Sequence, residues 1–303
     1  MKCKPCGGTA VIDIPRHRAA FCAPCFTTHC HEQVRRAIRS FRMIAPGERV
    51  LVAISGGKDS LAVWDIMRAL GYDADGVYLG LGIGEYSDAS LEYAQSYADV
   101  RGLKLHVVDI PAEHGFAIPD AARATKRVPC SACGLSKRHL LNRAALDGGY
   151  PVLATGHNLD DEAAVLFGNV LQWQVGYLAR QRPVLPATTG FARRVKPLVR
   201  MGERETAAYC VLNGIDYLVE ECPMAAGNKH LRYKETLNAM EERSPGTKAA
   251  FYLKFLDDML PVLDGVADEE RALVGTCTRC GAPSSADVCA FCKLVDRVGS
   301  AGG

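Results

Sequence analysis

The chain has 303 residues and a formal net charge of +2; 48% of its residues are hydrophobic and 23% are charged. This composition is typical of a soluble protein with one large domain and small additional modules, and the net charge does not by itself indicate nucleic-acid binding. The sequence has no run of 18 apolar residues and no apolar N-terminal segment. These absences argue against a membrane span and against a secretory signal.

Five of the thirteen cysteines lie in residues 1–30, which we expect to form an N-terminal zinc module. So many thiols in a chain of this kind predict metal ligands in the reducing cytoplasm rather than disulfides. His29, Cys30 and His31 are spare donors near this module. Two CxxC pairs separated by 15 residues match a four-cysteine zinc site, made of Cys3, Cys6, Cys22 and Cys25.

Residues 31–48 are expected to form a basic linker, with a helix over 31–43 followed by a Pro-Gly turn. Four arginines recur there at intervals of three or four residues and so lie near one helical face. They are Arg35, Arg36, Arg39 and Arg42. A second basic group occupies residues 193–196. Such groups either contact nucleic-acid phosphates or form a solvated surface.

Residues 49–225 alternate between short apolar runs and segments with helical spacing, and we expect them to form the catalytic domain. Strands are expected at 50–54, 74–81, 103–108 and 151–155, and helices at 60–70, 87–101, 134–146 and 160–171. This order predicts an α/β fold, in which a mainly parallel, Rossmann-like sheet is covered by helices on both faces.

A glycine-containing loop follows the first expected strand and precedes a helix. Glycines let the backbone approach phosphates closely, and the N–H groups of a helix N-terminus favour anions. The loop also carries one lysine and two serine hydroxyls, but its spacing differs from that of a Walker A loop. The sequence therefore predicts another type of phosphate loop, formed by Ser55, Gly56, Gly57, Lys58, Asp59 and Ser60.

Residues 155–162, with the sequence TGHNLDDE, join the last expected strand to its helix. The carboxyl ends of parallel strands share one edge of a sheet, where ligands bind, so we expect this loop and its Gly156 beside the phosphate loop. Asp160 or Asp161 could hold Mg²⁺ or act as a general base. Capping of the helix by Asp160 is compatible with either role.

Beyond Gly202 the sequence becomes mainly helical, with a break at residues 244–246. We assign residues 226–270 to a helical extension and residues 271–303 to a C-terminal zinc module. Cys210 lies in an apolar helical segment and is expected to be a small buried hydrophobic residue. Two further CxxC pairs supply the ligands of the second module, namely Cys277, Cys280, Cys289 and Cys292. Metal binding would supply the folding energy of both modules.

Three cysteines remain outside these two patterns: Cys130, Cys133 and Cys222. Cys133 precedes an expected helix start and nearby cations, both of which favour a thiolate. The three thiols either carry a persulfide and form a transient disulfide, or ligate a [4Fe–4S] cluster with one iron left open. A zinc site would normally require a fourth ligand. Both interpretations predict sulfur chemistry beside the phosphate loop.

Together these motifs resemble the TtcA/TtuA family of tRNA 2-thiolation enzymes, most closely the TtuA type. The resemblance runs over nearly the whole chain. It rests on both terminal cysteine modules, residues 55–60, 130–138, 155–162 and 244–248, and the pair Cys222-Pro223. It implies a PP-loop ATP pyrophosphatase domain flanked by two zinc modules.

The resemblance also implies roles for individual residues. The loop 55–60 would bind ATP with Mg²⁺, Ala53 would lie beside adenine, and the three central cysteines would ligate the cluster. Lys137 and Asp161 match the proposed catalytic side chains. ATP would activate the C2 carbonyl oxygen of a tRNA uridine, most closely the T-loop 5-methyluridine, and sulfur would replace that oxygen. Expected partners are tRNA, a ubiquitin-like thiocarboxylated sulfur carrier or sulfide, and a second copy of the chain in a homodimer.

Two departures from the family pattern leave alternatives to T-loop thiolation open. Family members often have a histidine where this chain has Cys25, and a charged fraction of 23% does not indicate a thermophile, although T-loop thiolation is typical of thermophiles. The alternatives are a wobble-uridine or cytidine thiolase, a PP-loop synthetase that does not transfer sulfur, and a zinc-containing RNA-binding protein without catalysis.

Overall fold

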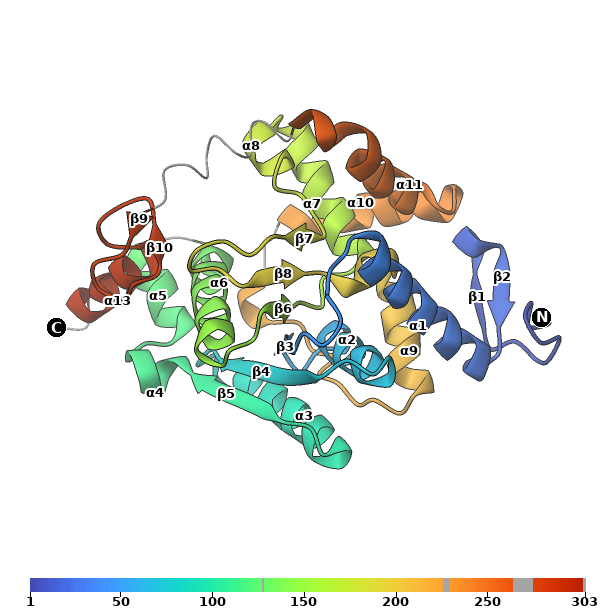
Figure 1. The fold of residues 1–303 in the computed structure, drawn as a ribbon, viewed down its shortest axis with the longest axis horizontal. Helices are drawn as coiled ribbons and strands as arrows, with labels where there is room; N and C mark the ends of the chain where they lie inside the picture. The colour runs from blue at the N-terminus through green and yellow to red at the C-terminus, as the bar shows by residue number, and fades with distance from the viewer. Residues whose placement is uncertain (127, 226–228, 264–274, 302–303) are drawn as a thin grey trace.

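The computed structural model describes residues 1–126, 128–225, 229–263 and 275–301. At its centre is a six-stranded sheet with the order β5-β4-β3-β6-β8-β7 (Figure 1). All neighbouring pairs are parallel except β7 and β8, so the predicted mainly parallel α/β fold is confirmed. The strands are β3 (Val50–Ile54), β4 (Ala74–Gly80), β5 (Leu105–Asp109), β6 (Val152–Ala154), β7 (Val184–Leu185) and β8 (Arg193–Val195).

Helices cover both faces of this sheet, as the β-α alternation predicted. One core contains side chains of α2 (Lys58–Ala69), α3 (Gly84–Arg101), α7 (Leu159–Leu171) and α9 (Glu203–Leu212). The other contains side chains of α4 (Ile110–His114), α5 (Ile118–Thr125) and α6 (Pro129–Asp147). Successive residues of β3 alternate between the two cores, with Val50 and Val52 in the first and Leu51 in the second. Among the described helices, none has the length and apolar character needed to cross a bilayer.

The strand order places a topological switch point between β3 and β6. From β3 the chain proceeds outward to β4 and β5, whereas β6 pairs with the opposite edge of β3 and leads outward to β8. Ligands of open α/β sheets bind outside the carboxyl ends of the strands at such a point. The loops that follow β3 and β6 are the two loops that the sequence analysis selected.

The N-terminal module is a hairpin of β1 (Ile12–Ile14) and β2 (Ala19–Phe21) joined by a short 3₁₀ turn, followed by α1 (Ala23–Ser40). The helix was expected to begin at residue 31, but it begins at Ala23, where Pro24 occupies the first turn and is compatible with a helix start. The module and the basic helix therefore form one continuous unit. Arg35, Arg36 and Arg39 are exposed on α1, whereas Arg42 is exposed beyond the end of the helix, so the four do not share one helical face as expected.

The C-terminal part contains α10 (Lys229–Arg243) and α11 (Thr247–Lys254), which pack on α7, and the break at 244–246 is confirmed. A π-helical turn (Phe255–Met259) and a 3₁₀ turn (Pro261–Leu263) continue α11. The last module comprises β9 (Gly275–Thr276), β10 (Pro283–Ser284) and α13 (Ala290–Ala301), and α13 packs on α5 and α6. The boundary expected at 225/226 lies at the edge of a segment outside the described residues, and the boundary expected at 270/271 lies inside another such segment. The domain division therefore stays a prediction.

Two cations of the basic group at 193–196 are held in ion pairs within the fold and do not form a free surface patch. The group forms strand β8, which the sequence analysis missed because the strand is short and charged. Arg193 pairs with Glu48 at 2.6 Å, and Lys196 Nζ lies 2.7 Å from Oε2 of Glu162. These two cations therefore stabilise the fold rather than remaining available to a polyanion.

Glu162 is the centre of a buried polar network beneath the C-terminal helices. Its side chain is only 2% exposed, and the same carboxylate oxygen that pairs with Lys196 also accepts hydrogen bonds from Gln181 Nε2 and Tyr252 OH, both at 3.1 Å. The network joins α7 to α11 and to the strand region after β8. Buried charges persist only when they are paired and hydrogen-bonded in this way.

Glu162→Ala should therefore lower the free energy of unfolding by about 3–5 kcal/mol, because it leaves Lys196 without its buried partner. Urea unfolding followed by circular dichroism measures the change. The matched control is Asp147→Ala, which removes the exposed pair with Arg143 and should cost below about 1 kcal/mol. Equal effects of the two substitutions would contradict the structural role of Glu162.

Candidate active site and metal clusters

The phosphate loop is a tight turn between β3 and α2, held by its own side chains. Ser60 Oγ accepts from the Ser55 backbone N at 3.1 Å and donates to the Gly57 carbonyl at 2.8 Å. Gly56 has φ +73°, and a Cβ there would lie 2.3 Å from the Ser90 carbonyl oxygen, so only glycine fits. The backbone N–H groups at the start of α2 point out of this turn without intrahelical partners, as an anion site requires.

The loop that follows β6 lies directly against the phosphate loop. A Cβ on Gly156 would approach the Asp59 carbonyl carbon and the Ser60 nitrogen to 2.8 Å. Asp59 Oδ1 accepts from Asn158 Nδ2 at 3.1 Å and from Thr206 Oγ1 at 2.5 Å. One carboxylate thus joins α2, the β6–α7 loop and α9. Burial raises the pKa of Asp59, and the charge of nearby Asp161 adds to this rise.

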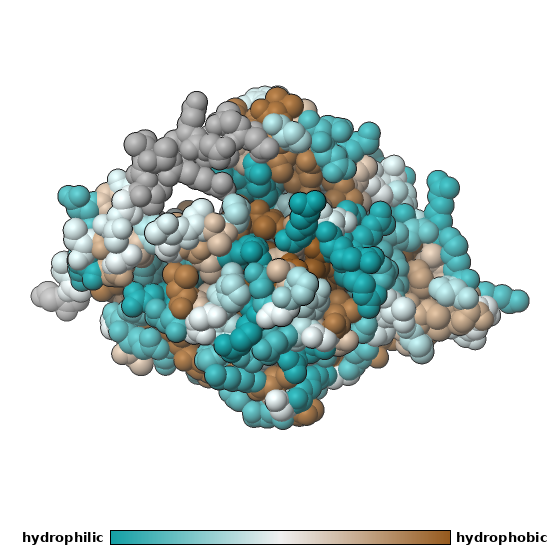
Figure 2. Space-filling model, viewed as in Figure 1, coloured by the Kyte–Doolittle hydropathy of each residue, from teal (hydrophilic) through white to brown (hydrophobic). Residues whose placement is uncertain are grey.

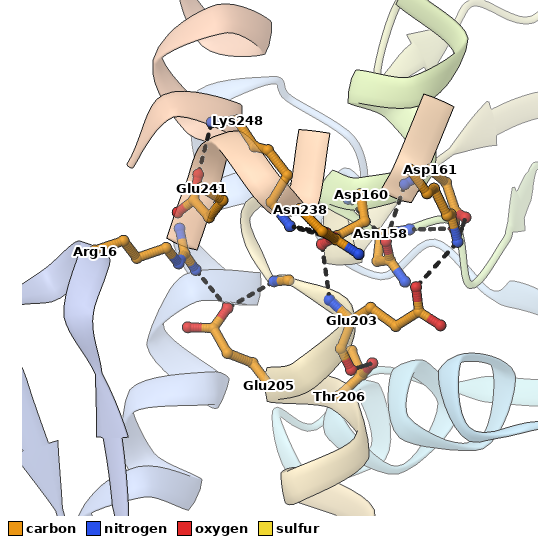
Figure 3. A network of polar contacts seen from close by, with 12 residues as sticks. Arg16, Asn158, Asp160, Asp161, Glu203, Glu205, Thr206, Asn238, Glu241 and Lys248 are labelled. Carbon is orange, nitrogen blue, oxygen red and sulfur yellow. Dashed lines mark hydrogen bonds and ion pairs between the residues drawn. The ribbon is translucent and has the colours of Figure 1, made fainter. Parts of the chain in front are cut away.

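The carboxylates of Asp161 and Glu203 lie near each other beside this turn (Figure 3), and Lys58 and Lys234 pair with them. Lys58 Nζ lies 2.8 Å from Glu203 Oε1, and Lys234 Nζ lies 2.6 Å from Asp161 Oδ1 and 3.1 Å from Glu203 Oε2. Burial acts to raise the pKa of Glu203, but Lys58 and Lys234 outweigh it and lower that pKa to about 2. Glu203 is therefore ionised at neutral pH. A bound nucleotide and Mg²⁺ would exchange partners with these lysines and carboxylates.

Asp160 and Asp161 have different surroundings, and these bear on which of the two could bind Mg²⁺ or act as a general base. Asp160 is 4% exposed, accepts from the Glu203 backbone N at 2.9 Å and pairs with Lys248. Asp161 pairs with Lys234 of α10, and its Oδ2 accepts from the Asn158 backbone N at 3.1 Å. The helix cap is Asn158, whose Oδ1 accepts from the backbone N of both aspartates, so the alternative that Asp160 caps α7 is wrong. Asp161 is the more accessible of the two carboxylates, with its side chain 26% exposed against 5% for Asp160.

A cavity of about 90 Å³ extends from the phosphate loop toward α6. Ala53 and Ser55 line it on the β3 side, and Lys137 of α6 lines it on the other. Tyr86 also lines the cavity. Burial raises the pKa of its hydroxyl, and the charges of the nearby Cys222 and Cys133 thiols raise it further. Tyr86 therefore lines the cavity at the phosphate loop and also lies near two of the central cysteines.

The three central cysteines come from two segments that are packed together. Cys130 and Cys133 lie in the first turns of α6, which begins at Pro129 rather than after Cys133 as expected. Cys130 Sγ lies 3.6 Å from the Met224 carbonyl oxygen, close to Cys222 in the sequence. Burial raises the pKa of Cys133, Lys137 opposes this rise, and the charges of Cys222 and Cys130 add to it.

The three central thiols differ in arrangement from the two terminal clusters. Among the described residues, they are not one of the groups whose ligand atoms converge as a single metal ion requires. A closed zinc site would normally also need a fourth ligand. A multinuclear iron–sulfur cluster separates its ligand sulfurs by several atoms. Three thiols that do not converge on one point fit such a cluster better than a third zinc.

The eight terminal cysteines form two compact clusters. In each, all four sulfurs lie within 4.8 Å of one another, and individual separations such as 3.6 Å for Cys6 and Cys22 match a tetrahedral metal. Backbone N–H groups lower the pKa of Cys277 to about 6. The donor set therefore fits a thiophilic metal at Cys3, Cys6, Cys22 and Cys25, and another at Cys277, Cys280, Cys289 and Cys292.

The spare donors of the first module do not join its cluster. Cys30 is fully buried in the core, as is Cys210, which confirms the interpretation of Cys210 as a small buried hydrophobic residue. His31 bonds to Tyr209 OH at 3.0 Å. The sequence analysis missed Glu203, Thr206 and Lys234 as site residues, because α9 and α10 reach the site through tertiary packing that no local motif records. Asn158 lies in the loop that the sequence selected, but its roles as helix cap and as donor to Asp59 were not predicted.

The fold and these clusters define a class: α/β proteins with a phosphate loop and two four-thiolate modules. A solved structure with a similar fold is the U34-tRNA thiolase NcsA from Methanococcus maripaludis with its [4Fe-4S] cluster. It matches with a TM-score of 0.81 and 23% identity, and covers 98% of this chain and 96% of that one. This match supports the fold.

Sequence comparison identifies the family within that class. The family model "2-thiouridine synthetase TtuA, N-terminal LIM domain" matches residues 2–27. The tRNA-5-methyluridine(54) 2-sulfurtransferase of Thermus thermophilus is 52% identical over 298 residues, 98% of this chain and 92% of the relative. The same enzyme of Pyrococcus horikoshii is 41% identical, covering 97% and 93%. This chain belongs to the family of tRNA-5-methyluridine(54) 2-sulfurtransferases, which confirms the resemblance to the TtuA type.

Gly156→Ala should reduce ATP turnover in the presence of tRNA by on the order of 10²-fold, because the methyl group forces the two loops apart and misplaces the nucleotide. Release of AMP and pyrophosphate measures the effect. Gly299→Ala is the matched control, since a Cβ at Gly299 meets nothing within 4 Å. Unchanged turnover in Gly156→Ala would show that close contact between the loops is not needed.

The low pKa of Glu203 predicts a pH-dependent contribution to stability. Its folded pKa of about 2 lies below the ordinary value of 4.5, so the contribution is complete above pH 4.5 and is lost as the pH falls toward 2. The difference in Tm between wild type and Glu203→Gln should be constant above pH 4.5 and shrink below it. Glu92→Gln, on the exposed face of α3, is the control. A pH-independent difference would refute the assignment.

Proposed function

We propose that the chain is an ATP-dependent tRNA uridine 2-sulfurtransferase that acts on 5-methyluridine 54 in the cytoplasm. The observation that carries the proposal is that Cys133 and Cys222 lie near Tyr86, whose side chain lines the cavity at the phosphate loop, with Cys130 one turn before Cys133 on α6. An amide-forming synthetase or a noncatalytic RNA-binding protein would have no use for these thiols. The identity of 52% to a 5-methyluridine(54) enzyme favours this nucleotide over the wobble uridine.

The phosphate loop would bind ATP with Mg²⁺. Backbone N–H groups and the side chains of Ser55, Lys58 and Ser60 would hold the phosphates, with Ala53 beside adenine. Asp59 and Asp161 would bind Mg²⁺ directly or through water. The C2 carbonyl oxygen of the uridine would displace pyrophosphate from ATP and become adenylated. AMP would then leave with that oxygen as sulfur bonds to C2.

Lys137 and Asp161 would act on the reacting base from opposite sides of the site. Lys137 lines the cavity between the phosphate loop and the cysteines, where its ammonium would stabilise the charge that develops on the C2 oxygen. Asp161 would position the metal or accept a proton. The three cysteines would hold a [4Fe–4S] cluster, which when bound supplies an open iron for the sulfur to be transferred.

The surface around this site would contact tRNA. Arg138 of α6 and Arg194 of β8 face each other, and burial together with the charge of Arg138 lowers the pKa of Arg194. Within the described part of the chain, no carboxylate pairs with either guanidinium, so a phosphate group would relieve their repulsion. The exposed arginines of α1 would extend this contact. Zinc in each terminal module would maintain the fold.

The sulfur would come from a ubiquitin-like carrier protein that ends in a thiocarboxylate, or from free sulfide. The enzyme would work as a homodimer. These proposals rest on the family resemblance, and activity of the purified chain with sulfide, ATP and tRNA would test the simplest version.

Replacing any of the three central cysteines by alanine should reduce thiolation to background and remove the iron–sulfur absorbance after anaerobic reconstitution, since each removes a cluster ligand. Nucleoside mass spectrometry of the tRNA and iron analysis measure the two effects. Cys30→Ala is the matched control, because this thiol is fully buried in the core on α1. Full thiolation by Cys133→Ala or Cys222→Ala would overturn the proposed sulfur chemistry.

A further inference from the structure

Three unpartnered ligand atoms converge where the N-terminal hairpin meets the catalytic domain. They are His17 Nε2 at the tip of the hairpin, His29 Nε2 on α1, and Glu205 Oε1 in the first turn of α9. All three atoms are buried, and none has a hydrogen-bond partner in the described part of the protein. They lie within 4.8 Å of one another. No sequence motif indicated this group, since its members are far apart in the chain.

The carboxylate is fixed so that one oxygen faces the two imidazoles. Glu205 Oε2 accepts from the Gly202 backbone N at 2.6 Å and from Arg16 at 2.5 Å (Figure 3). This leaves Oε1 free, although the side chain is only 5% exposed. A carboxylate oxygen so buried requires a partner, and neither the hairpin nor α9 supplies one.

The distances indicate that an atom is required between these groups. His17 Nε2 and His29 Nε2 each lie 4.0 Å from Glu205 Oε1, which is too far for a direct hydrogen bond. Around a tetrahedral zinc, with Zn–N and Zn–O of about 2.1 Å, ligand atoms are about 3.4 Å apart. Small side-chain movements of less than about 1 Å would therefore close the site.

The chemistry of the donors selects the kind of ion. Two imidazoles and one carboxylate form a set that zinc and similar divalent transition metals prefer, and three protein ligands leave a position for water. Burial lowers the pKa of both histidines, so they are neutral and able to coordinate. Arg16 bonds to the carboxylate oxygen that does not face the imidazoles, as an orienting partner of a metal ligand does.

We propose that His17, His29 and Glu205 bind a third divalent metal ion, separate from the two four-cysteine clusters. The ion would crosslink the hairpin, α1 and the N-terminal turn of α9. Glu205 also lines a cavity of about 530 Å³ between the hairpin and α9–α11, which provides a path for the ion and its water. Because Glu203 in the same turn contacts Lys58, the ion would hold α9 in place against the phosphate loop.

Zinc stoichiometry tests this site without relying on activity. The full chain is incubated with excess Zn²⁺, desalted and analysed by mass spectrometry of the metal, alongside cysteine titration to confirm that both four-cysteine clusters are intact. Wild type should hold three zinc ions per chain, whereas His17→Asn and His29→Asn should each hold two. The matched control is His31→Asn, on the same helix but bonded to Tyr209, which should keep three.

Co²⁺ provides a second readout. Loading the third site should add weak d–d absorbance without the sulfur charge-transfer bands that the two cysteine clusters produce, and this component should be absent from His29→Asn. Two zinc ions in wild type would overturn the proposal and show that an ordered water joins the three side chains. Three ions in His17→Asn and His29→Asn would overturn it equally. Should one variant fail to fold, the wild-type count and the other variant decide.

Discussion

The arrangement of the site depends on the buried carboxylate of Asp59. It receives hydrogen bonds from Asn158 and Thr206, which come from the loop after β6 and from α9. This shared acceptor joins the three segments at the switch point of the sheet, and the ion pair between Lys58 and Glu203 adds to it. Gly156 permits the close contact between the loops because it has no side chain that would separate them. The geometry of the turn thus depends on one carboxylate that three elements must satisfy.

The sequence predicted those elements of the fold that are defined by patterns of residues close together in the chain. Apolar runs separated by helical spacing defined β3, β4, β5 and β6, and glycine with strand–loop–helix context defined the phosphate loop. Pairs of cysteines with two residues between them predicted both terminal clusters. The two short strands β7 and β8 were missed because β8 begins with two arginines and neither run is long enough to show alternation.

The parts that the sequence could not predict depend on tertiary contacts. Glu203 and Lys234 reach the phosphate loop from α9 and α10, and each makes ion pairs there across a large separation in the chain. Asp160 and Asp161 are adjacent in the sequence, but Asp160 pairs with Lys248 of α11, whereas Asp161 pairs with Lys234 of α10, which also contacts Glu203. Helix starts were also misplaced, since proline at α1 and α6 begins each helix earlier than the apolar pattern does.

Helix α1 explains how a small metal module can influence a distant nucleotide site. Cys25 and His29 lie one turn apart on this helix, and Val34 and Ile38 further along it are buried in the main core. The hairpin is too small to bury a core of its own, so its position is set by the four-cysteine cluster and by this helix. The same helix packs on α9, whose first turn carries Glu205 toward the hairpin and Glu203 toward Lys58. A helix that joins the four-cysteine cluster at one end and the core at the other therefore fixes where α9 presents its carboxylates to the phosphate loop.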